Sequence, residues 1–425
     1  MLVAIFLTLD AGKSTIGGHL LYLTGMVDQR TLDKYEKESK ELNRESWYFS
    51  WALDTNEEER MKGITVEAGM AHFETEHRKF TVLDAPGHKN YVPNMISAAA
   101  QADVAILVIS ARKGEFEAGF EKEGQTREHA MLVKTAGVER LIVVINKMDE
   151  STVNWSKERF DECVSKLTHF LKGCGFNPKT QVVFIPISGF TGANLKIKVR
   201  SEECDWYSGP TLLEYLDSMP SIERVIFGSF MMPVTDKFKD MGTVVSGKVE
   251  SGQLRKGMNV VLMPINRPCE VVGIYDDEDE IDSTQCGDNV KIKLKGVEDE
   301  EVQQGFVLCG TMKPVKVANT FIAQLVFETI PSIVSIGFTS MIHIHTCVEH
   351  ATIESFICKI DRKTLKKSKL KLPCARSRDV VIVKIRVQQG ICVEAFDDYP
   401  QLGRFTLRSK TQTIARGKVL KVIQE

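Results

Sequence analysis

The sequence predicts an α/β domain with a mixed, mostly parallel sheet, followed by two all-β barrel domains. Three observations support this expectation. The 425 residues are too many for one hydrophobic core. Up to about residue 220, apolar runs alternate with segments of helical spacing, which is typical of a parallel sheet covered by helices. From about residue 230, short runs rich in Val and Ile are broken by Gly, Pro and Asp, and helical periodicity is absent.

Buried strands are expected in the first half at the runs Leu2–Leu7, Phe80–Leu83, Val104–Ile109, Leu141–Ile145 and Val182–Ile187. Helices are expected between them, for example over Thr126–Gly137 and Ser156–Lys172. Ligands of such sheets bind at the carboxyl ends of the strands. The polar motifs described below all follow these runs, apart from Thr65.

Two changes of pattern set the expected domain boundaries. Helical periodicity stops near Met219-Pro220, and a second break falls near Lys313–Asn319. We therefore expect domains over 1–220, 221–315 and 316–425. The barrel strands are expected around Gly242–Lys248, Asn259–Met263, Val290–Leu294, Phe306–Cys309, Phe321–Glu328, Thr339–Thr346, Ala351–Ile360, Asp379–Val387, Ile391–Glu394 and Gly403–Leu407.

A phosphate-binding turn is predicted at Asp10-Ala11-Gly12-Lys13-Ser14-Thr15, between the first strand and a helix. In such a turn, backbone N–H groups and the helix N-terminus face the anion. Lys13 would neutralise the outer phosphates and the Ser14 hydroxyl would hold Mg²⁺. The motif occurs often by chance, so its interpretation depends on four further signals.

Two of these signals concern the terminal phosphate. Asp84-Ala85-Pro86-Gly87 follows a strand, so that Asp84 could orient a metal-bound water and the Gly87 N–H could reach the phosphate. His88 comes next and is predicted to position the attacking water as the catalytic residue. Thr65 follows a polar stretch and would complete the Mg²⁺ shell only while the phosphate is bound.

The other two signals concern the base. Asn146-Lys147-Met148-Asp149 ends a strand, and the Asp149 carboxylate can accept hydrogen bonds from guanine N1 and N2. Adenine lacks those donors and would leave the carboxylate unpaired. Asn146 would meet the base edge and the Lys147 stem would cover the ring. Ser188-Gly189, followed by Phe190, is expected to complete the base pocket. Together these motifs predict a P-loop GTPase domain.

The order and spacing of the motifs resemble those of translational GTPases of the elongation factor one-alpha branch. Within that branch the chain is most similar to the GTP-binding subunits of eukaryotic polypeptide chain release factors. The stretches that carry this resemblance are Leu23–Asp28, Glu45–Asp54, Arg112–Glu121, Lys239–Lys248, His343–Cys347 and Gly403–Arg408.

The resemblance implies a function in translation termination. Such a GTPase binds GTP and GDP with Mg²⁺, partners the class I release factor, and promotes stop-codon-dependent peptide release by hydrolysing GTP on the ribosome. The class I factor is expected on the last barrel, with Arg404 and Phe405 as candidate contacts. Asp10 is a candidate ligand of a monovalent ion.

The chain departs from the family pattern in several places. Leu7-Thr8 stands where the family has Gly-His, and the bulky Leu7 is expected to weaken nucleotide binding. Ile64 and Met70 stand where Lys and Arg are expected. The long N-terminal extension of the family is absent, so a poly(A)-binding partner is not expected, and a truncated or divergent copy is one interpretation.

Composition narrows the possible classes of function. A net charge of -2 argues against a chain that coats nucleic acid, and no DNA partner is expected. The ten cysteines show no Cys-x-x-Cys spacing, which favours a reduced, cytoplasmic protein. No run is long enough to span a membrane. The basic run Arg362–Arg378 is either a solvated loop or a contact to RNA phosphates.

Three alternatives to a termination GTPase stay open from the sequence. One is a ribosome-rescue GTPase of the same branch, which would differ in its protein partner. Another is a nucleotide-impaired paralogue that keeps the barrels and the partner contact as a binding protein. The weakest is an aminoacyl-tRNA carrier.

Overall fold

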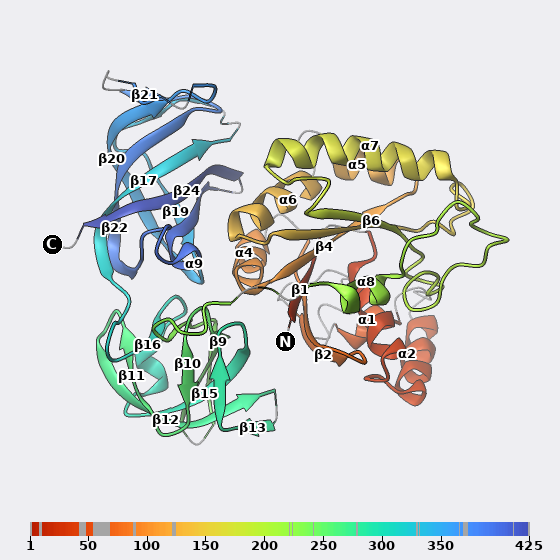
Figure 1. Ribbon diagram of the computed structural model, residues 1–425, viewed down its shortest axis with the longest axis horizontal. Helices are drawn as coiled ribbons and strands as arrows, with labels where there is room; N and C mark the ends of the chain where they lie inside the picture. Colours follow the sequence, from red (N-terminus) through yellow and green to blue (C-terminus); the bar gives the residue numbers. More distant parts are fainter. Residues whose placement is uncertain are drawn as a thin grey trace. The chain divides into compact units, whose positions relative to one another are not determined.

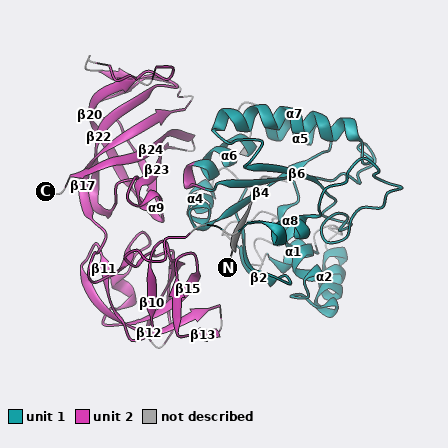
Figure 2. Ribbon diagram, in the orientation of Figure 1, with its two compact units in different colours: residues 1–134, 138–222 teal, residues 135–137, 223–425 magenta. Residues whose placement is uncertain are grey.

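The computed structural model describes residues 2–7, 11–41, 48–53, 69–87, 91–120, 125–220, 222, 224–240, 242–277, 279–328, 330, 332–364, 366–368, 373–410 and 412–423. The chain forms two compact units, 1–134 with 138–222 and 135–137 with 223–425 (Figure 2). Unit 1 is the α/β part, and unit 2 contains the two β parts (Figure 1). The three domain boundaries expected above stay a prediction.

Unit 1 is built on a six-stranded sheet in the order β2-β3-β1-β4-β5-β6. β2 runs antiparallel to β3, and the other neighbours are parallel. The predicted mixed, mostly parallel sheet is thereby confirmed. The bounds are β1 Leu2–Leu7, β2 Gly69–Glu74, β3 Lys79–Asp84, β4 Val104–Ser110, β5 Arg140–Asn146 and β6 Val182–Pro186.

Helices cover both faces of this sheet, with α6 and α7 on one side and α1 and α8 on the other (Figure 1). The strands can be apolar throughout because both faces are buried, as in β4, in which every residue is buried. The bounds are α1 Lys13–Leu23, α2 Gln29–Glu41, a short 3₁₀ helix η2 Ser50–Ala52, α4 Val92–Gln101, α5 Glu115–Phe120, α6 Gln125–Ala136, α7 Lys157–Cys174 and α8 Leu212–Ser218.

The ends of α7 and α8 follow local sequence signals. The Ser156 hydroxyl caps α7 by accepting from Arg159 N, and Gly175 ends it in the left-handed conformation. Thr211 and Glu214 form a capping box at the start of α8. Among the described residues, no helix has both the length and the apolar character needed to cross a bilayer.

The first β part of unit 2 is an antiparallel sheet in the order β7-β16-β11-β12-β15-β9-β8, with β13 paired to β12. Met231 in β7 also bridges to Ser251, just beyond β9, so the sheet curls back on itself. The bounds are β7 Met231–Pro233, β8 Asp236–Lys239, β9 Thr243–Lys248, β10 Gln253–Arg255, β11 Asn259–Met263, β12 Arg267–Asp276, β13 Asp279–Ile281, β14 Ser283–Gln285, β15 Asn289–Lys295, the 3₁₀ helix η4 Asp299–Glu301, and β16 Val307–Gly310.

The second β part is a closed barrel in the order β17-β22-β20-β19-β23-β24. Its core is one apolar cluster that includes Phe321, Leu325, Ile385 and Phe405. The bounds are β17 Val317–Phe327, β18 Val334–Ser335, β19 Thr339–Ile344, β20 Cys347–Ile360, β21 Cys374–Ala375, β22 Val380–Cys392, α9 Pro400–Gly403, β23 Arg404–Ser409 and β24 Gln412–Ile423. The α/β domain followed by β domains agrees with the predicted fold class.

Candidate functional site

The predicted phosphate turn leads from β1 into α1. Gly12 is the residue that precedes the helix and has φ 88°, a left-handed conformation that glycine adopts without strain. Its carbonyl accepts from Ile16 N at 3.0 Å and starts the helical ladder. Lys13 is the first residue of α1 and is buried, Ser14 and Thr15 follow in the first turn, and Ala11 is buried just before it. The first N–H groups of α1 therefore lie where an anion can meet them.

Ser14 and Asp84 are brought together from distant parts of the sequence. The Ser14 hydroxyl donates to Asp84 Oδ2 at 2.5 Å. Asp84 ends β3 and is fully buried, and Gly87, three residues later, is buried as well. A hydroxyl and a carboxylate are the oxygen donors that Mg²⁺ prefers, so these two residues fit a magnesium site.

Asn146 joins the phosphate turn to the loop after β6. Its Nδ2 donates to Ala11 O at 2.7 Å, and its Oδ1 accepts from Gly189 N at 2.7 Å. The side chain is buried, so both bonds are shielded from water. One residue at the end of β5 thereby fixes two of the predicted ligand-binding segments relative to each other.

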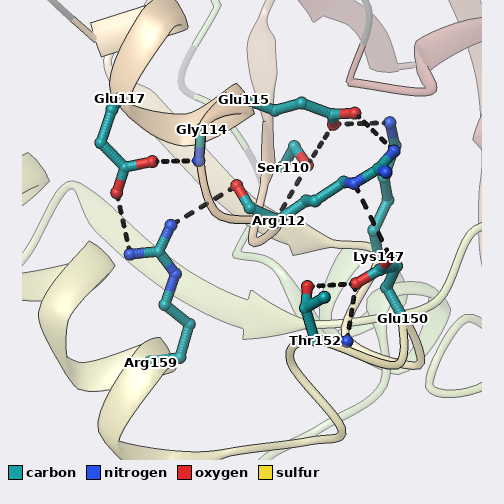
Figure 3. A network of polar contacts seen from close by, with 9 residues as sticks. All are labelled: Ser110, Arg112, Gly114, Glu115, Glu117, Lys147, Glu150, Thr152 and Arg159. Carbon is teal, nitrogen blue, oxygen red and sulfur yellow. Dashed lines mark hydrogen bonds and ion pairs between the residues drawn. The ribbon is translucent and has the colours of Figure 1, made fainter.

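The rest of the predicted base tetrad follows Asn146 directly. Lys147 has φ 62°, and its Nζ donates to Glu115 Oε2 at 2.7 Å (Figure 3). Met148 is buried, and its N–H donates to Ile187 O at 3.2 Å. Asp149 is exposed at the tip, where its carboxylate can meet the donors of a base. Burial alone would raise the pKa of Glu115, but hydrogen bonds from Lys147 and Ser110 hold that pKa below its usual value.

The loop after β6 packs tightly against α1. Ser188 is buried, and its hydroxyl accepts from Thr191 N at 3.1 Å. A Cβ atom on Gly189 would lie 2.6 Å from Ile16 Cγ1, so any larger residue there would force Ile16 to shift. Phe190 is 49% exposed and meets the ring of Tyr48 edge-on, with centroids 6.4 Å apart.

His19 is a site residue that the sequence did not indicate. Its Nδ1 hydrogen-bonds Gly189 O at 2.9 Å, so Nδ1 is the donor. The ring stacks on Phe49 with centroids 4.0 Å apart. Burial lowers the pKa of His19, and the bond to Gly189 opposes this only in part. A histidine inside a helix gives no sign of such a contact, because the partner is 170 residues away.

Three of the predicted site residues, Asp10, Thr65 and His88, lie outside the described residues. Of the two predicted partner contacts in unit 2, Arg404 donates from Nε to Pro400 O at 2.9 Å. Phe405 is buried in the barrel core, where its ring lies 5.9 Å from that of Phe321. A role of Phe405 in partner binding would therefore be indirect, through the placement of its strand.

The family described as elongation factor Tu GTP binding domain matches residues 1–221. Elongation factor Tu domain 2 matches residues 242–309, and the GTP-eEF1A C-terminal domain-like family matches residues 320–420. Because the first match covers more than half of the chain, the chain belongs to the family of the elongation factor Tu GTP-binding domain.

Two curated relatives narrow the comparison. A protein of Kluyveromyces lactis is 54% identical over 98% of this chain and 59% of its own length, and one of Schizosaccharomyces pombe is 53% identical over 97% of this chain and 62% of its own length. Both are named eukaryotic peptide chain release factor GTP-binding subunit. The chain thus spans about three fifths of these relatives.

A solved structure shares the fold. The Ski7 GTPase-like domain of S. cerevisiae, bound to GTP, superimposes with a TM-score of 0.80 at 19% identity, over 98% of this chain and 96% of that one.

Proposed function

We propose that the chain is the GTP-hydrolysing part of a translation termination factor. It binds GTP and GDP with Mg²⁺, partners a class I release factor, and promotes stop-codon-dependent peptide release on the ribosome. The observation that carries this proposal is the side chain of Asn146, which bonds Ala11 O and Gly189 N. These bonds join the phosphate and base segments at one edge of the sheet. The names of the two curated relatives support the step from nucleotide binding to termination.

Base selection rests on the loop after β5. The exposed Asp149 carboxylate accepts two hydrogen bonds from guanine N1–H and N2–H. Adenine would leave that carboxylate without donors, which costs more than a lost hydrogen bond to a neutral group. The aliphatic stem of Lys147 covers one face of the base.

Phosphate binding rests on the start of α1. The N–H groups after Gly12 point at the phosphates, and the Lys13 ammonium neutralises their charge. Ser14 supplies a hydroxyl ligand for Mg²⁺, and Asp84 accepts from that hydroxyl or from a metal-bound water. When bound, Mg²⁺ neutralises the negative charge that develops between the outer two phosphates.

Hydrolysis of GTP takes place at the terminal phosphate. A water oxygen bonds to the γ-phosphorus while the bond to the bridging oxygen breaks, which gives GDP and phosphate; one proton of the water stays on the phosphate and the other is released to solvent. His88 positions that water, Thr65 senses the phosphate, and Asp10 holds a monovalent ion. Gly87 donates its N–H to the γ-phosphate and so responds to whether that phosphate is present.

The class I release factor binds the last barrel in this proposal, and Arg404 is its candidate contact there. The protein would act in the cytoplasm, where ribosomes terminate.

The test is GTP turnover by the purified chain with ribosomes and the class I release factor. Turnover that needs both components, and that ATP does not replace, supports the proposal. Equal use of ATP, or no nucleotide binding, would overturn it. Pull-down of the class I factor against a stalled-ribosome rescue factor distinguishes termination from rescue.

A second candidate is a nucleotide-impaired binding protein. Leu7 favours it, because this residue is the last in β1 and pairs with Leu107, where the family has a flexible glycine. Partner binding without turnover would support this candidate. Turnover restored by Leu7→Gly would identify the cause.

A further inference from the structure

The segment Ser110–Phe120, which runs from the end of β4 to the end of α5, has no role in the function proposed above, yet it contacts the base loop. Glu115 is the centre of this contact. Its Oε2 accepts from Lys147 Nζ at 2.7 Å and from Ser110 Oγ at 2.7 Å (Figure 3). Its Oε1 accepts from Arg112 Nη1 at 3.2 Å. The Glu115 carboxylate therefore binds Lys147 of the base loop and is itself fixed by Ser110 and Arg112.

Arg112 extends the contact to the far side of Asp149. Its Nε lies 3.6 Å from Glu150 Oε1. Glu150 Oε2 in turn accepts from Thr152 N at 2.8 Å and from the Thr152 hydroxyl (Figure 3). Lys147 thus contacts Glu115, Glu150 contacts Arg112, and these two partners bond to each other, so that one chain of contacts joins the residues before and after the Met148-Asp149 pair.

The other end of this segment is anchored to α7. Glu117 Oε2 accepts from Gly114 N at 2.6 Å, and Glu117 Oε1 accepts from Arg159 Nη1 at 3.0 Å. Arg159 is buried and also donates from Nε to Ala111 O at 2.8 Å. Its guanidinium lies 5.2 Å from the ring centre of the buried Phe116. Glu115 therefore projects from a segment that the core fixes in place.

We propose that Glu115 is a positioning residue for guanine recognition. It holds Lys147 directly and Glu150 through Arg112, and so keeps Asp149 at the geometry that pairs with the two donors of the base. This inference rests on the proposed nucleotide binding. The pair is partly exposed, at 34% for Glu115 and 32% for Lys147. A contribution equivalent to about a two- to five-fold change in affinity is expected for such a pair.

The test measures dissociation of fluorescently labelled GDP from the full chain and from Glu115→Gln, which keeps the shape and removes the charge. We expect dissociation to be about two to five times faster in the variant. The preference for GDP over inosine diphosphate, which lacks the N2 amine, should fall as well. The matched control is Glu74→Gln, which removes the exposed ion pair between Glu74 Oε1 and Lys79 Nζ, 2.8 Å apart in the hairpin of β2 and β3. It should change neither the rate of GDP dissociation nor the preference for GDP over inosine diphosphate.

A double-mutant cycle with Lys147→Ala separates positioning from general stability. In the Lys147→Ala background, Glu115→Gln should have less effect than in the wild type, because the direct contact is already lost. A full effect in that background, or unchanged dissociation and preference in Glu115→Gln itself, would overturn the inference while leaving the proposed function intact. A wild-type chain that binds no GDP would overturn both.

Discussion

Asn146 occupies the space that a side chain on Gly12 would need. A Cβ atom on Gly12 would lie 2.7 Å from Asn146 Nδ2, and the same amide donates to Ala11 O at 2.7 Å. The Asn146 side chain at the end of β5 therefore packs directly against the phosphate turn and leaves no room for a side chain at Gly12. Gly189 N donates to Asn146 Oδ1, the other polar atom of the same side chain. A change at Asn146 therefore affects both the phosphate segment and the base segment of the site.

Replacing Asn146 by Ala should weaken binding of labelled GDP by more than ten-fold and lower the free energy of unfolding by about 1–3 kcal/mol. The reason is that Ala11 O and Gly189 N would be left buried without their partner. Fluorescence titration measures the affinity, and urea denaturation followed by circular dichroism measures the stability. An Asn146→Ala chain that binds GDP like the wild type would show that the link has no part in binding.

Gly12→Ala should reduce GDP affinity far more than Gly25→Ala. Both glycines have a positive φ, 88° and 82°, so alanine costs each about 1 kcal/mol of backbone strain. A Cβ atom meets Asn146 at Gly12 but nothing within 4 Å at Gly25. Gly25→Ala is thus the control for strain alone. Equal losses of GDP affinity in the two variants would contradict the claim that the close packing of Asn146 against Gly12 supports nucleotide binding.

The sequence predicted the sheet well because its strands are buried on both faces. Runs such as Val104–Ile109 are apolar throughout, and the structure places them in parallel register. Since parallel strands end at one edge, the positions of Asp84 and Asn146 followed from the strands themselves. These positions required no knowledge of long-range contacts.

The contacts that support the site could not be predicted in this way. His19 and Glu115 contact partners far along the chain, Gly189 and Lys147. Glu115 lies in a stretch that carries the family resemblance, but that stretch does not indicate which residue it contacts. The sequence predicts Phe405 as a partner contact, whereas four consecutive residues of β23 are buried and the Phe405 ring packs in the barrel core. Local pattern does not reveal which side chains a closed barrel encloses.

Ser14→Ala should make GDP dissociation insensitive to removal of Mg²⁺ by EDTA. The hydroxyl that lies 2.5 Å from Asp84 Oδ2 would be lost, and with it the protein ligand proposed for the ion when GDP is bound, since Thr65 would join only with the terminal phosphate. The wild-type chain should release GDP faster after EDTA is added. Stopped-flow fluorescence measures both rates.

Ser14→Thr is the matched control because it keeps the hydroxyl, and it should retain at least part of the EDTA response. A Ser14→Ala variant with a wild-type response would show that other groups hold the ion.

The last barrel should lose stability in acid because it buries two neutral histidines. His345 Nε2 hydrogen-bonds Cys392 O at 3.0 Å and is the donor, since a carbonyl only accepts, so the other ring nitrogen is unprotonated. Burial lowers the pKa of His345 from 6.5 to about 4, and the bond to Cys392 opposes this only in part. Burial, followed by the charge of Arg408, lowers the pKa of His343 to about 4.

The unfolded chain therefore binds protons first as the pH falls. The stability from each histidine is fully present above about pH 6.5 and is lost between 6.5 and about 4, at up to about 3 kcal/mol each. Urea unfolding of the full chain at pH 7.5 and pH 5.0, followed by tryptophan fluorescence and circular dichroism, measures the change. The double variant His343→Gln/His345→Asn should start less stable at pH 7.5 but depend less on pH. If the wild type and the double variant lose the same free energy between the two pH values, the buried histidines are not the source of the acid sensitivity.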